Sequence, residues 1–100
     1  MAFENGALDA TLAAAAGDDA ALFRELRAAF RESLENHVDL LSRARCDGNW
    51  NIALMRLRGL ACSFHVDELI ALADEAQSLA PGDPTIVRKL KAMLDDFPRD

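Results

Sequence analysis

Apolar side chains recur at intervals of three and four residues along most of the chain, as they do on one face of an α-helix. No stretch alternates apolar and polar residues with the period of two that a half-buried strand requires. Only five glycines and three prolines interrupt the 100 residues. Leu, Ala, Arg and Glu, which are good helix formers, dominate the rest. The sequence therefore predicts an all-α fold.

The N-terminal half contains two predicted helices of unequal length. The first covers residues 7–16, is rich in alanine and stops at Gly17; residues 1–17 either dock loosely or fray. The second is about 26 residues long, begins at an N-cap formed by Asp18 or Asp19, and ends near Arg43 and Arg45. Its apolar stripe comprises Phe23, Leu26, Phe30, Leu34, His37 and Leu41.

Three further helices are predicted in the C-terminal half. A turn at residues 46–49 leads into a third helix from about residue 50 to 64, and a fourth covers residues 67–79. Pro81 and Gly82 break the chain, Asp83 caps the fifth helix, and Pro98 stops it. A length of 100 residues predicts one domain over residues 1–100. Short connections make neighbouring helices antiparallel. We expect an up-and-down four-helix bundle with an extra short N-terminal helix.

The charge balance excludes several classes of partner. Seventeen acidic side chains outnumber eleven basic ones, which gives a net charge of −6. Nucleic acids and anionic membrane surfaces are bound mainly through Lys and Arg, so neither is an expected partner. No long uncharged apolar run predicts a transmembrane helix, and the first residues lack the pattern of a signal peptide. We expect a cytoplasmic protein.

Residue types that carry catalysis or bind metals occur without the spacing that such sites need. Cys46 and Cys62 do not form a metal-ligand pattern, and the acidic pairs fall at helix caps and solvated faces. No sequence-local nucleophile and base mark an active site. We therefore expect no metal, no cofactor and no enzymatic turnover. Trp50 is interpreted as a core anchor at the end of the bundle.

The third predicted helix has two distinct faces. At 100° per residue, one sector contains the apolar residues expected in the core, namely Ala53, Leu54, Leu57, Leu60, Ala61 and Phe64. The opposite, exposed sector contains Met55, Arg56, Arg58, Gly59, Cys62 and Ser63. A glycine in the middle of a helix costs up to about 1 kcal/mol relative to alanine. Gly59 therefore suggests a close approach to the backbone, either by another helix of the same bundle or by a partner.

The run from Ala53 to Ala61, with Leu57-Arg58-Gly59 at its centre, resembles the phosphoacceptor segment of histidine phosphotransfer (HPt) domains, His-x-Leu-Lys-Gly. Phe64 and Leu69 are similar to the family's continuation into its next helix, and the resemblance covers about residues 19–80. It implies a four-helix bundle that works in a two-component phosphorelay. Its partners would be a receiver domain of a response regulator or a histidine kinase.

The chain departs from the family at the residue that carries the chemistry. Met55 occupies the position of the phosphoryl-accepting histidine, and a thioether cannot hold a phosphoryl group as an imidazole nitrogen can. Arg58 matches the basic residue of the motif, and Gly59 matches its glycine. The resemblance therefore implies a module that binds without relaying phosphate. Its docking strip consists of Met55, Arg56, Arg58, Gly59 and Cys62, and we expect it to act as a monomer rather than a homodimer.

Two alternatives stay open at this point. In the first, the protein is an active phosphocarrier that uses a non-standard histidine, either His65 or His37. In the second, it is a helical scaffold or dimer subunit unrelated to phosphorelay, in which Met55, Gly59 and Cys62 form a helix-packing seam. The arginines beside Cys62 also leave open a redox-reactive thiol.

Overall fold

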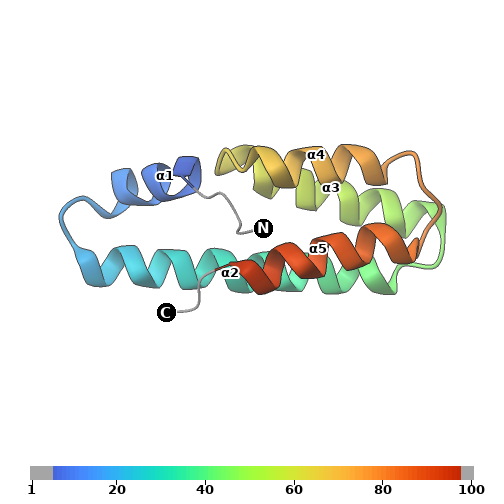
Figure 1. Ribbon diagram of the computed structural model, residues 1–100, viewed down its shortest axis with the longest axis horizontal. Coiled ribbons are helices and arrows are strands. Elements are labelled where there is room, and N and C mark those ends of the chain that lie inside the picture. The colour runs from blue at the N-terminus through green and yellow to red at the C-terminus, as the bar shows by residue number, and fades with distance from the viewer. Residues whose placement is uncertain (1–5, 98–100) are drawn as a thin grey trace.

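The computed structural model describes residues 6–97, and this part of the chain is helical with no strand (Figure 1). The predicted all-α class is confirmed. The helices are α1 (Gly6–Ala16), α2 (Ala20–Arg43), α3 (Asp47–Ser63), α4 (Asp67–Ala76) and α5 (Pro84–Asp96). The expected stop at Pro98 lies outside the described residues.

Two predicted helix boundaries are wrong. α3 begins at Asp47 rather than near Trp50, because Cys46 has extended backbone angles and the chain turns helical directly after it. The carboxylate of Asp47 suits this position, since the first turn of a helix favours negative charge. α4 ends at Ala76 rather than at Leu79. The next three amides bond to carbonyls three residues back, so residues 77–79 continue as tighter turns.

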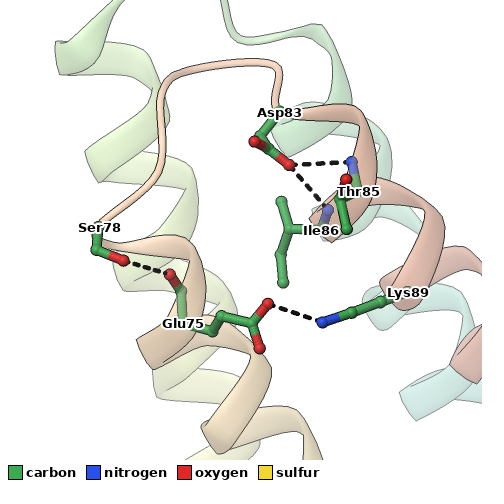
Figure 2. A network of polar contacts seen from close by, with 6 residues as sticks. All are labelled: Glu75, Ser78, Asp83, Thr85, Ile86 and Lys89. Carbon is green, nitrogen blue, oxygen red and sulfur yellow. Dashed lines mark hydrogen bonds and ion pairs between the residues drawn. The ribbon is translucent and has the colours of Figure 1, made fainter.

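Aspartates fix the beginnings of α2 and α5. Of the two candidates for the α2 cap, Asp19 is the one whose side chain accepts a hydrogen bond from the amide of Leu22, at 3.0 Å. Asp83 accepts from the amides of Thr85 and Ile86, at 2.9 and 3.2 Å, as Figure 2 shows. Pro84 occupies the first turn of α5, where its missing N–H is not needed.

Helix α2 is the longest element and contacts three others. α1 packs on its N-terminal half, and α3 and α5 lie along its C-terminal half (Figure 1). α4 contacts α3 and α5. The molecule is elongated along α2, with extents of 44, 26 and 18 Å (Figure 1).

Aromatic side chains join the helix ends inside the core. The ring of Phe30 on α2 meets Phe64 edge to face at 4.9 Å between centroids, and lies 5.6 Å from Phe97. Trp50 is buried at the other end of α3, where its indole N–H donates to the carbonyl of Ala76, 3.2 Å away. This bond links the start of α3 to the end of α4. Trp50 is thus a core anchor, as predicted.

Candidate functional site

The two faces predicted for α3 are present in the structure. Ala53, Leu54, Leu57 and Ala61 are buried, and Leu60 and Phe64 are partly buried. Every residue of the predicted exposed sector is exposed. Met55 is 66% exposed, the largest fraction among the exposed large apolar residues of the described chain.

An open groove between α3 and the end of α4 gathers four of the five residues of the docking strip. Met55, Arg58, Gly59 and Cys62 line it, together with three other residues, Asn51, Leu54 and Gln77. Sequence reasoning had missed Asn51 and Gln77. Asn51 could have been found, because it lies one helical turn before Met55 on the same face. Gln77 could not, because only the packing of α4 on α3 brings it there.

The fifth residue of the strip, Arg56, lies on the other side of α3. It lines a separate groove between α2 and α3, which also includes His37, Leu40 and Ile52. Leu40 and Ile52 are about half exposed, at 49% and 48%. The structure therefore divides the predicted strip between two grooves that flank one helix.

Arg58 is held by a carboxylate of the neighbouring helix. Its Nε donates to Asp74 on α4 at 2.8 Å, and one Nη lies 3.6 Å from the sulfur of Cys62. The hydrogen bond that Arg58 donates to Asp74 and the negative charge of that carboxylate raise the pKa of Arg58 above its usual value. Both side chains of the ion pair remain about half exposed. Arg58 thus holds α3 to α4 as well as lining the groove.

Gly59 faces open space. A Cβ atom built on it would meet no atom within 4 Å beyond its own helix neighbourhood. Close packing by another helix of the same bundle, one of the two explanations for this glycine, is therefore wrong for this chain. A partner that approaches the α3 backbone from outside stays a prediction.

The two histidines lie outside the α3–α4 groove. His65 follows the end of α3 in the left-handed backbone region, with φ of 60°, and is exposed. His37 is partly buried on α2, and its Nδ1 donates to the carbonyl of Ser33 at 2.6 Å. His65 thus lies just after a helix, and His37 is a hydrogen-bonded residue within one.

Over residues 6–97, no three His, Cys, Asp or Glu side chains gather closely enough to hold a metal ion. No helix in the same range has the length and apolar character to cross a membrane. Comparisons with models of protein families, with curated proteins and with solved structures find no match to this chain.

Proposed function

We propose that this protein is an HPt-like docking module that binds a receiver domain or a histidine kinase without carrying phosphate. The supporting observation is the pair formed by Met55 and Gly59, one turn apart in the middle of α3. Met55 is 66% exposed, and the space above Gly59 is open. An apolar contact beside bare backbone suits a partner that packs closely against the helix.

The contacts between helices support the bundle that such a module needs. α3 packs against α2 and α4, and α5 packs against the same two helices. We propose that α2, α3, α4 and α5 form the up-and-down four-helix bundle and that α1 is an addition to it. In this arrangement α3 lies at the surface over its whole length, with a groove on either side.

Met55 is the reason that the proposed module does not carry phosphate. In HPt domains the residue at this position attacks an acyl phosphate through a neutral ring nitrogen, and a thioether offers no comparable nucleophile. A methionine still contributes a flexible apolar surface that adapts to a partner. The module would then compete with an active relay protein for its receiver, or tether that receiver.

Arg58 contributes less to docking in this proposal than the sequence alone suggests. Its Nε is bonded to Asp74, so only the remaining guanidinium N–H groups can face the acidic site of a receiver. Replacing Arg58 with Glu would also place two carboxylates together at the α3–α4 contact. A variant that tests docking should therefore be made elsewhere in the groove.

Gly59 offers such a variant. Gly59→Gln fills the space that a partner would occupy, and the structure accommodates it because the added Cβ meets no atom. Gly48→Gln is the matched control: Gly48 lies in the first turn of the same helix and also faces open space, outside the groove. Both variants should fold at least as stably as the wild type, since glutamine is the better helix former.

The test is an NMR titration of labelled protein with receiver domains from its own proteome, with and without a phosphoryl mimic. The proposal predicts amide shifts clustered at residues 51–62, affinity reduced about tenfold or more by Gly59→Gln, and no change with Gly48→Gln. If no receiver shifts these amides and sedimentation gives a dimer that covers Met55, the scaffold interpretation replaces the proposal. Acid-labile phosphate on the wild type, lost in His65→Ala or His37→Ala, would establish an active carrier instead.

A further inference from the structure

The groove between α2 and α3 is separate from the proposed docking groove, and the function proposed above does not use it. Its volume is about 300 Å³. Two small residues, Ala44 directly after α2 and Ala53 on α3, line the hollow and are themselves nearly buried. Because neither has a side chain beyond Cβ, the space between the helices is not filled. The hollow is therefore a direct result of the residue types at this crossing.

The walls of this groove are apolar. Leu40 on α2 and Ile52 on α3 both line it, and about half of each side chain is exposed. A ligand that filled the space would cover the exposed apolar surface of both side chains and remove it from water, which favours binding.

The polar groups at the groove carry positive charge or none. Arg43 and Arg56 line it with Asn49 and His37, and no acidic side chain is among the described lining residues. Arg43 is paired with Asp39 one turn earlier, whereas Arg56 has no ion pair among residues 6–97. A protein with a net charge of −6 thus presents a local site that suits an anion.

We infer that the α2–α3 groove binds a small molecule with an apolar body and one carboxylate. The body would lie on Leu40 and Ile52 above the two alanines, and the carboxylate would accept hydrogen bonds from Arg56. The volume supports a small molecule, because it falls at the lower end of the range for such sites.

Octanoate is a suitable probe, and octanol is its uncharged counterpart. In an NMR titration of the full chain, octanoate should produce saturable shifts at the amides around residues 40, 49, 52 and 56. Octanol should bind roughly tenfold more weakly, because it lacks the charge that Arg56 recognises. Equal binding of the two compounds, or an absence of saturable shifts with octanoate, would overturn the inference.

Variants distinguish a specific binding site from a general electrostatic attraction of anions to the protein. Arg56→Gln should weaken octanoate about tenfold and Ile52→Ser roughly fivefold, and both sites are exposed enough to leave the fold intact. Arg24→Gln, which removes the same charge from the distant N-terminal half of α2, should have no effect. If Arg24→Gln weakens binding as much as Arg56→Gln, the site is not specific. If an acidic amphipathic peptide shifts these amides and octanoate does not, the groove is a protein-docking surface and the inference is wrong.

Discussion

Two glycines of this chain have opposite roles at the residue scale. Gly17 follows α1 with φ of 65°, a backbone conformation that side chains with a Cβ rarely adopt. Gly59 lies inside α3 with helical angles and open space around it. The conformation of Gly17 therefore requires a glycine, whereas no contact among the described residues requires one at position 59.

The same substitution at these two sites should therefore change stability in opposite directions. Gly59→Ala should raise the free energy of unfolding by about 0.5–1 kcal/mol, because alanine loses less conformational freedom in a helix. Gly17→Ala should lower it by about 1 kcal/mol, because the left-handed conformation strains the new Cβ. Urea denaturation of both variants measures the difference, and a destabilising Gly59→Ala would contradict the open position of this residue.

The ion pair between Arg58 and Asp74 gives a second prediction for single residues. Arg58→Glu should destabilise the fold, because two carboxylates would then face each other between α3 and α4. Combining it with Asp74→Arg should restore stability, because the pair is re-formed with its charges exchanged. Thermal unfolding of the two single variants and the double variant tests this; additive losses would show that the two side chains do not interact.

Single residues were predictable where one helix determines their environment. The exposure of Met55, the burial of Leu57 and the capping role of Asp83 follow from helical periodicity and local hydrogen bonding. The partner of Arg58 did not follow from the sequence, because Asp74 is sixteen residues away and on another helix. Contacts of this kind depend on how two helices are placed against each other, which periodicity does not encode.

At the element scale, the stability of α5 depends on the N-cap at its first turn. Asp83→Ala should lower the free energy of unfolding by about 1 kcal/mol, because the amides of Thr85 and Ile86 lose their acceptor (Figure 2). Asp95→Ala removes the same charge from the last turn of α5 and should be neutral or slightly stabilising, since a carboxylate there opposes the helix dipole. Equal losses in the two variants would contradict the capping role.

Helix α1 is anchored by two leucines. Leu8 and Leu12 are essentially buried, although the alanine-rich sequence around them has little amphipathic character. Leu12→Ala should lower the free energy of unfolding by about 2–5 kcal/mol, as for other buried leucines. Leu22→Ala, at a side chain that is 36% exposed, should have an effect below about 1 kcal/mol. A Leu12→Ala variant as stable as wild type would mean that α1 does not dock.

Helix ends were less predictable than helices themselves. The start of α3 was placed three residues too late because Gly48 and Asn49 are typical of turns, yet here they continue a helix that Asp47 has begun. The end of α4 was placed too late because Leu79 continues the apolar spacing. That spacing persists through tighter turns, so it did not reveal where the α-helix stops.

At the scale of the whole molecule, α3 separates two grooves with different surroundings. The sequence placed the residues of the predicted docking strip on the exposed face of one helix, and each of them is exposed in the structure. It could not show that α2 and α4 divide this face, so that Arg56 belongs to one groove and Met55 to the other. Half-exposed Leu40 and Ile52 were missed for the same reason, because the gap between two alanines exists only after the helices pack.

The central claim is that this protein has a docking surface but lacks the nucleophile. Phosphotransfer to the Met55→His variant tests this claim most directly. A receiver domain that binds the wild type is phosphorylated and then mixed with the wild type, Met55→His or Met55→Gln. The acid-labile phosphate transferred from the receiver to each of these three proteins is measured. We expect phosphate on Met55→His alone, because an imidazole would then project from the exposed centre of α3. Phosphate on the wild type, or none on a Met55→His protein that still binds the receiver, would contradict the account.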